Sequence, residues 1–164
     1  MIASANPTQS VDIKKAGQPQ PAPVTQPSQP AGGAGLSQND ALQLLQLVNQ
    51  ARNQNGAPPL SYNTKLTLAA GKHSQDMAAR NYFSHTAPQP APNGAAMSER
   101  ATNAGYHWSQ IAENIASGQT TVQAVFNSWM NSPGHKANIL NPAYAEMGIG
   151  RAGNLWTQMF GKSW

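Results

Sequence analysis

The sequence predicts an α+β domain, in which helices come first along the chain and a small antiparallel sheet comes last. Several segments between residues 38 and 131 repeat apolar side chains at intervals of three and four, which is the period of an amphipathic helix. Residues 146–151 and 155–160 are instead short, bulky runs flanked by Gly, Asn and Pro, which is typical of a β-hairpin. Residues 111–115 are a further candidate strand of this sheet.

The composition changes near residue 36. Nearly half of the 13 prolines lie in residues 1–35, interleaved with Gln, Ala and Ser, and this stretch has almost no bulky apolar side chain. Such a segment cannot offset the entropy that it would lose on ordering. We therefore predict a disordered Pro/Gln/Ala-rich segment over residues 1–35, either a tether to an envelope anchor or a plain tail. Residues 36–164 are expected to fold as one domain.

Two long helices are expected at the start of this domain. Ser37 or Asn39 can cap the first one, and Gly56 stops it. Its buried face comprises Leu44, Leu45, Val48 and Arg52. A second helix is expected from about Thr64 to Tyr82. Its inner stripe comprises Leu66, Ala69, Ala70, His73, Met77 and Ala78.

Shorter helices are expected before the hairpin. The first covers residues 97–104 and ends at a glycine. The pair Thr120-Thr121 can cap a helix over residues 122–131, which Pro133-Gly134 interrupts. Residues 135–141 are expected to add one more helical turn.

Charge and composition exclude several classes of protein. The net charge is +4, but the ten basic residues are scattered from Lys14 to Lys162, so we expect no nucleic-acid binding. The chain has no Cys, and hence no disulfide and no thiolate metal site. No apolar run approaches the ~20 residues of a membrane span. The first residues lack the features of a signal peptide, so the protein is either cytosolic or has lost a leader.

Few side chains are able to carry chemistry. The motifs of serine hydrolases, zincins and nucleotide-binding enzymes are absent. Four polar residues lie at the ends of expected elements or within short apolar frames: His85, Glu113, His135 and Glu146. Imidazoles and carboxylates that meet in a cleft can share a proton or hold a divalent cation. Each residue taken alone is equally explained as a hydrogen-bonded core residue or a cap.

Other polar and bulky residues have a structural interpretation. The spacing of His73 and Asp76 suits a metal, but a core histidine beside a surface aspartate is the better interpretation. Glu99 and Arg100 are interpreted as a local ion pair at the surface. The bulky side chains expected in the core are Trp129, Met130, Trp156 and Met159.

Four strings carry a family resemblance. They are NYFSHTAP, GYHWSQIAENIASG, SWMNSPGHKANILNPAYAEMGIG and LWTQMFGKSW, in this order. Together they resemble the CAP superfamily (cysteine-rich secretory proteins, antigen 5, pathogenesis-related 1) in its short bacterial form, also called SCP-like. The resemblance covers about residues 38–162. It implies an α-β-α sandwich, with a small antiparallel sheet between helical layers and a cleft lined by two histidines and two acids.

The resemblance assigns the cleft residues one by one. His85 matches the first family histidine, Glu113 the glutamate of the G-E-N string (here with Ala112 in place of Gly), and His135 the histidine of the S-P-G-H string. The family's second acid follows the helix tryptophan, where this chain has Met-Asn-Ser, so Glu146 is the substitute. The residues expected to support the site or its ligand are Asn114, Ser132 and Asn138.

Three functions follow from the resemblance. The first is a secreted or envelope-associated protein whose His/Glu cleft binds a ligand or a divalent cation. The second is a metal-assisted hydrolase in which His85 and His135 hold Zn²⁺ or another divalent cation, and Glu113 is the general base for a bound water. The third is a non-catalytic interaction module displayed on the N-terminal tether. The ligand remains open among a lipid, a glycan and a protein.

Overall fold

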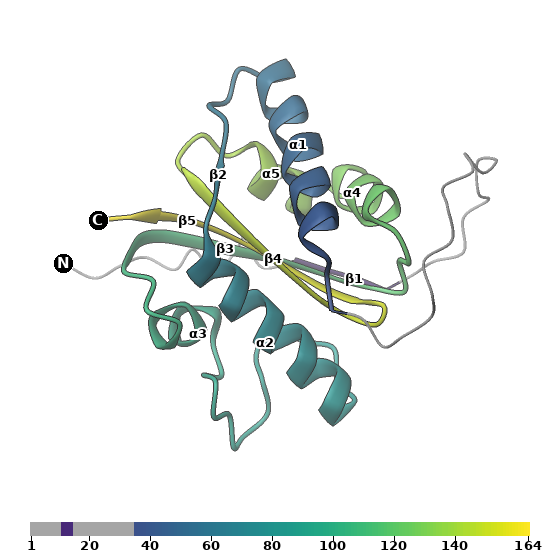
Figure 1. Ribbon diagram of the computed structural model, residues 1–164, viewed down its shortest axis with the longest axis vertical. Coiled ribbons are helices and arrows are strands. Elements are labelled where there is room, and N and C mark those ends of the chain that lie inside the picture. The colour runs from purple at the N-terminus through teal and green to yellow at the C-terminus, as the bar shows by residue number, and fades with distance from the viewer. Residues whose placement is uncertain (1–10, 15–34) are drawn as a thin grey trace.

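A five-stranded sheet lies between two layers of helices in the computed structural model, which describes residues 11–14 and 35–164. The helices are α1 (Gln38–Gln54), α2 (Thr64–Arg80), α3 (Met97–Asn103), α4 (Val122–Met130) and α5 (Pro133–Leu140). The strands are β1 (Val11–Lys14), β2 (Ser61–Tyr62), β3 (Trp108–Ser117), β4 (Glu146–Ala152) and β5 (Leu155–Ser163). Figure 1 shows α2 and α3 on one face of the sheet and α1, α4 and α5 on the other. This arrangement confirms the expected α-β-α sandwich.

The centre of the sheet is antiparallel, whereas its two edges are parallel. The strand order is β1-β3-β5-β4-β2. The predicted hairpin is β4–β5, closed by a turn at Gly153, whose φ of 59° lies in the left-handed region that glycine adopts without strain. The candidate strand at residues 111–115 is the middle of β3, which pairs with β5 along its length.

Helix boundaries follow the capping chemistry of the sequence. The Ser37 hydroxyl accepts a hydrogen bond from the Asp40 N–H at 3.1 Å and caps α1. The Asn63 side chain caps α2 in the same way. The helix over residues 122–131 ends before Pro133-Gly134 and a second helix follows, as predicted, and Pro133 itself starts this second helix, α5. Proline suits the first turn of a helix, where its missing N–H has no partner to lose.

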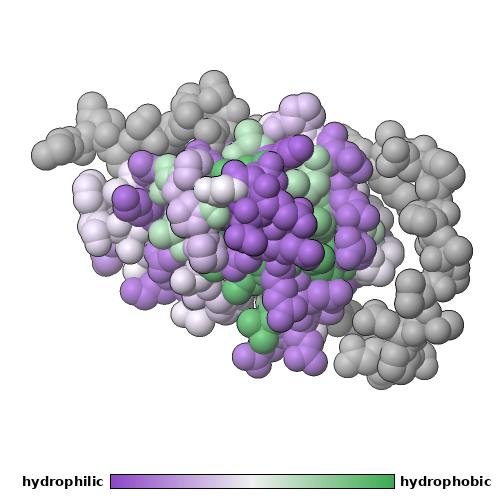
Figure 2. All heavy atoms as spheres, turned by 90° about the horizontal axis from the view of Figure 1, so that it is seen from above, coloured by the Kyte–Doolittle hydropathy of each residue, from purple (hydrophilic) through white to green (hydrophobic). Residues whose placement is uncertain are grey.

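Apolar side chains form one core on each face of the sheet. The first core, under α1, α4 and α5, contains Trp129 and Trp156, both fully buried as predicted. The second core, under α2 and α3, contains Met159, as predicted. Met130, which was also expected in the core, is only half-buried. On the side where α1 lies, hydrophilic residues cover most of the surface (Figure 2). Within the part of the chain that the structure describes, no helix has the length and apolar character to cross a membrane.

The N-terminal segment differs from the expected tether where it is described. Val11–Lys14 is strand β1, which pairs in parallel with the outer edge of β3. The outer edge of a strand offers unpaired N–H and C=O groups, so a short segment can pair there through its backbone, a contact that composition does not reveal. Residues 1–10 and 15–34 of the predicted tether lie outside the described residues.

Candidate functional site

Strand β3 presents two adjacent polar residues, Glu113 and Asn114, to opposite faces of the sheet. Neighbouring residues of a strand point to opposite sides. Glu113 contacts side chains from α2 and α3, whereas Asn114 contacts α5. The predicted site residues therefore divide into two groups, one on each face of the same strand.

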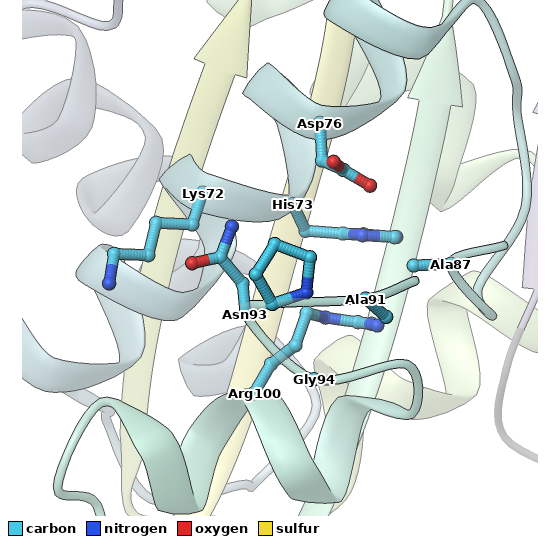
Figure 3. A pocket seen from close by; sticks show the side chains of 9 residues that line it. Lys72, His73, Asp76, Ala87, Ala91, Asn93, Gly94 and Arg100 are labelled. Atoms are coloured by element: carbon cyan, nitrogen blue, oxygen red, sulfur yellow. The ribbon is translucent and has the colours of Figure 1, made fainter. Parts of the chain in front are cut away.

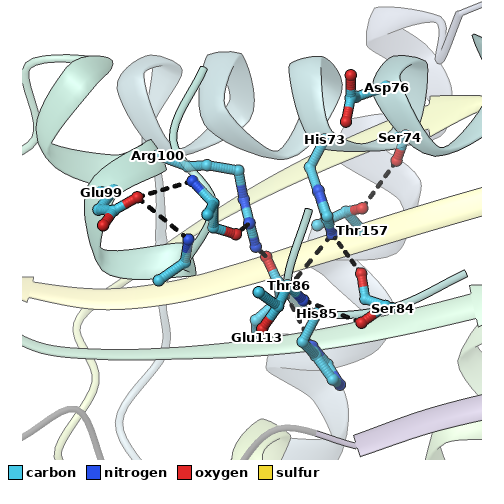
Figure 4. A network of polar contacts seen from close by, with 12 residues as sticks. His73, Ser74, Asp76, Ser84, His85, Thr86, Glu99, Arg100, Glu113 and Thr157 are labelled. Carbon is cyan, nitrogen blue, oxygen red and sulfur yellow. Dashed lines mark hydrogen bonds and ion pairs between the residues drawn. The ribbon is translucent and has the colours of Figure 1, made fainter. Parts of the chain in front are cut away.

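The Glu113 carboxylate is the centre of the group on the α2/α3 face. It is fully buried, and both of its oxygens are engaged. Oε2 accepts a hydrogen bond from Arg100 Nη2 at 2.6 Å, and Oε1 lies 2.8 Å from His85 Nδ1 (Figure 4). The structure thus brings together His85 and Glu113, as expected, and adds Arg100.

The charge of Glu113 determines which proton His85 carries. Burial by itself would raise the pKa of Glu113, but Arg100 and the hydrogen bond from His85 lower it to about 2. At neutral pH the carboxylate is ionised and can only accept hydrogen bonds, so His85 Nδ1 must be the donor. In the neutral imidazole, a proton on Nδ1 leaves the lone pair on Nε2. His85 Nε2 is buried and has no hydrogen-bond partner among the described residues.

His73 is a second, neutral histidine beside this pair. It is buried, its Nε2 donates to the Ser84 carbonyl at 3.0 Å, and it lies 4.0 Å from Glu113 Oε1. Burial lowers the pKa of His73 to about 4. The Asp76 carboxylate instead accepts hydrogen bonds from Arg80 and Tyr82. These contacts support the core interpretation of His73 and not a His73–Asp76 metal pair.

A surface depression adjoins His73 and Arg100 under the loop of residues 86–96. Figure 3 shows Lys72, Asp76 and Asn93 around it. His73 Nδ1 and Arg100 Nε are buried nearby without hydrogen-bond partners in the described part of the chain. The depression is narrow, and its lining shares His73 and Arg100 with the surroundings of Glu113.

His135 belongs to the group on the α5 face. It is fully buried, and its Nδ1 lies 2.8 Å from the Ser132 hydroxyl. The Asn114 side chain donates to the His135 carbonyl at 3.2 Å, and its own oxygen accepts from Asn138 Nδ2 at 2.8 Å. Asn114, Ser132 and Asn138 therefore hold the start of α5 and its histidine against β3.

Glu146 does not join either group. It lies on β4, which is separated from β3 by β5. Its carboxylate accepts hydrogen bonds from the Tyr106 hydroxyl at 2.6 Å and from Asn63 Nδ2 at 2.7 Å. These contacts fix the Glu146 side chain beside Tyr106, so the structure does not bring it together with His85 and Glu113.

Arg100 is the site residue that sequence reasoning missed. The predicted surface ion pair with Glu99 is wrong: Arg100 is 2% exposed and pairs with Glu113, while Glu99 accepts from the backbone N–H groups of Ala95 and Ala96. The spacing of Met97, Arg100 and Ala101 carried the signal, because residues three and four apart share the buried face of a helix.

The described residues do not make a complete metal site. No group of three or more His, Cys, Asp or Glu side chains within residues 11–14 and 35–164 is arranged to hold an ion. The chemistry of His85 does suit one bond to a cation, since a histidine whose Nδ1–H is held by a carboxylate presents Nε2 as a ligand.

Comparisons with known proteins converge on one family. The model of the cysteine-rich secretory protein family (CAP) matches residues 45–160. The uncharacterized protein YkwD of Bacillus subtilis is 37% identical over 119 residues, which cover 71% of this chain and 45% of that protein. The uncharacterized membrane protein YlbC of the same organism is 32% identical over 122 residues, which cover 74% and 34%. The chain thus spans less than half the length of these curated relatives.

Solved structures share the fold. An extracellular SCP-domain protein from Bacillus anthracis superposes with a TM-score of 0.72 at 29% identity, over 76% of this chain and 41% of that one. An outer surface protein from Borrelia burgdorferi superposes with a TM-score of 0.70 at 21% identity, over 81% of this chain and 100% of that one. At 21% identity the second likeness concerns the fold alone.

Proposed function

This chain belongs to the cysteine-rich secretory protein (CAP) family, and on that premise we propose that it is a secreted or envelope-associated bacterial domain that binds its ligand through His85 Nε2. The observation that carries the proposal is the contact of His85 Nδ1 with the ionised Glu113 carboxylate at 2.8 Å. The extracellular SCP-domain protein from Bacillus anthracis, among the similar structures, supports the location.

Glu113 acts in this proposal as a positioning residue. Its carboxylate fixes the ring of His85 and the proton on Nδ1, so that Nε2 keeps its lone pair. Because Nε2 is buried in this structure, ligand binding in this proposal requires the residues that cover it to move aside. Its lone pair can then accept a hydrogen bond from a hydroxyl or amide of a lipid, glycan or protein, or bind a divalent cation such as Zn²⁺. In this proposal the divalent cation is one of the ligands that the domain can bind.

The same geometry disfavours hydrolysis with Glu113 as the general base. A general base works best when its pKa lies near the operating pH. The pKa of Glu113 is lowered to about 2, and its two oxygens are engaged by Arg100 and His85. A carboxylate in this state has little tendency to remove a proton from water, so ligand binding is the better-supported function.

Calorimetric titration of Zn²⁺ into the full chain, with Mg²⁺ and Ca²⁺ as controls, tests the cation form of the proposal. We expect His85→Ala to abolish binding and Glu113→Gln to weaken it by about 10–100-fold, as loss of a carboxylate behind a ligating histidine does. His107→Ala, a change at an exposed histidine, is the matched control and is expected to leave binding unchanged. Equal binding by the wild type and His85→Ala would contradict the assignment.

The tautomer of His85 can be measured independently of any ligand. Long-range ¹H–¹⁵N NMR spectra at neutral pH are expected to show the proton of His85 on Nδ1. A proton on Nε2 in the wild type would overturn the proposal, whichever ligand the domain takes. In Glu113→Gln the preference for Nδ1 is expected to weaken, since a Gln amide can both donate and accept.

A further inference from the structure

Among residues 11–14 and 35–164, the outer edge of β3 has a strand partner over only part of its length. The inner edge of β3 pairs with β5 from Trp108 to Ser117, whereas the described partner of the outer edge is β1, at Asn114–Ser117. Pairing at a strand edge uses backbone N–H and C=O groups, so it accepts many sequences. The edge is therefore suited to hold an extended segment of peptide.

The pairing between β1 and β3 is short and parallel. Val11 lies opposite Asn114 and Lys14 lies opposite Ser117, so the contact covers four residues. Parallel pairs are slightly less stable per residue than antiparallel ones, and so short a ladder adds little stability by itself. The Pro-rich residues 15–34 then connect β1 to the domain along the chain. The covalent link raises the effective concentration of β1 at the edge.

The position of β1 adjoins both groups of site residues. Its first residue lies opposite Asn114, the neighbour of Glu113 on β3. β1 also packs against α5, the helix that carries His135. The strand order places β1 at the edge of the sheet, beside β3. A segment at this edge therefore lies between the α5 face and the α2/α3 face.

We propose that the outer edge of β3 is a peptide-binding site, which residues 11–14 occupy in the free protein. Its partner is an extended peptide that adds to the sheet parallel to β3 and displaces β1. The occupant in the structure shows the chemistry required, namely a short segment that pairs through its backbone. This binding mode is separate from the His85 site and does not depend on His85 Nε2.

Proline substitution in the full chain tests whether β1 covers the edge in solution. Along a parallel strand, only every second residue hydrogen-bonds to a given neighbouring strand. The double substitution Asp12→Pro/Ile13→Pro therefore removes a backbone N–H donor to β3, whichever of the two residues supplies it. We expect amide hydrogen exchange at Asn114–Ser117 to become at least about tenfold faster at those amides that do not bond to β5. Val24→Pro/Thr25→Pro, a matched pair of changes outside β1, is expected to leave exchange unchanged. Equal exchange in all three proteins would overturn the proposal.

A peptide added in trans tests the binding site itself. The probe is a labelled peptide with the sequence of residues 8–17, and the control is the same peptide with both proline substitutions. We expect the probe to bind the Asp12→Pro/Ile13→Pro chain at least about tenfold more tightly than the wild type, where β1 competes, and to restore slow exchange at β3. Exposure of the edge without binding of the probe would refute a peptide site. Retention of peptide binding in His85→Ala would separate this result from that for the proposed function.

Discussion

Glu113 shows how one residue sets the state of its neighbours. Its buried carboxylate is compensated by Arg100, and its ionisation assigns the proton of His85. A buried charge without such a partner is strongly destabilising. This explains why the Arg100 side chain points from α3 toward the sheet and not into solvent. The family string around Glu113 predicts the acid, but Arg100 follows only from the packing of α3 on β3.

His73 makes the stability of the domain sensitive to acid. The unfolded chain binds a proton at His73 near pH 6.5, whereas the folded chain does so only near pH 4. The unfolded state therefore gains protons first as the pH falls, and stability is lost between these values. From pH 7 to pH 5 we expect a loss of about 2 kcal/mol from this group.

Urea unfolding at pH 7 and pH 5 measures this loss. His73→Gln keeps a donor for the Ser84 carbonyl and has no charge to gain, so its stability is expected to change about 2 kcal/mol less than that of the wild type. The other histidines are present in both proteins and cancel in the comparison. The same pH dependence in both proteins would show that His73 does not set the acid sensitivity.

At the scale of elements, two glycines of β4 allow α2 to lie directly on the sheet. A Cβ added at Gly148 would overlap the backbone of Leu66 and Thr67, and one added at Gly150 would overlap that of Ala70 and Gly71. The close approach of this helix to β4 therefore depends on residues without a side chain. It brings the α2 residues His73 and Ser74 onto the sheet, where the Ser74 hydroxyl donates to Thr157 at 2.8 Å.

Alanine substitutions on the two sides of this contact should have opposite effects. Gly150→Ala is expected to lower the free energy of unfolding by about 1–3 kcal/mol, because α2 must move away from β4. A Cβ added at Gly71 would have no neighbour within 4 Å. Gly71→Ala is therefore expected to raise the free energy of unfolding by about 0.5–1 kcal/mol, since Ala favours a helix interior. Chemical denaturation of both variants checks the pair. A stabilising Gly150→Ala would contradict the close contact.

At the scale of the whole molecule, Arg52 joins the beginning of the domain to its end. Its buried guanidinium on α1 donates to the carbonyls of Pro58, Ile139, Asn141 and Tyr144. The last three belong to the end of α5 and the connection to β4. The predicted buried face of α1 included Arg52, and the structure shows that this position serves hydrogen bonding between distant segments.

Replacement of Arg52 should destabilise the entire domain. Arg52→Met fills similar space but leaves the carbonyls without their donors, so we expect a loss of about 3–5 kcal/mol. Lys136→Met, which removes an exposed cation from α5, is the control and is expected to change stability by less than about 0.5 kcal/mol. Thermal and urea unfolding measure both. A loss for Arg52→Met no larger than for the control would show that the carbonyls find other donors.

The sequence by itself determined the helices, the β4–β5 hairpin and the family. Periodicity, caps and turn residues are local properties, and the four family strings lie in order along the chain. It also indicated His85 and Glu113 as partners, which the structure brings within 2.8 Å. The helices and the hairpin depend on residues that are close together in the sequence, and the family assignment depends on the four sequence strings.

Only the tertiary structure decided which side chains meet across elements. It paired Arg100 with Glu113, fixed Glu146 beside Tyr106, and placed β1 on the edge of β3. The physical reason is that a buried charge takes whatever partner the packed helices bring to it, and a strand edge pairs through its backbone whatever the side chains are. The spacing of Met97, Arg100 and Ala101 indicates that Arg100 is buried, but no local pattern in the sequence names the partner of either kind of contact.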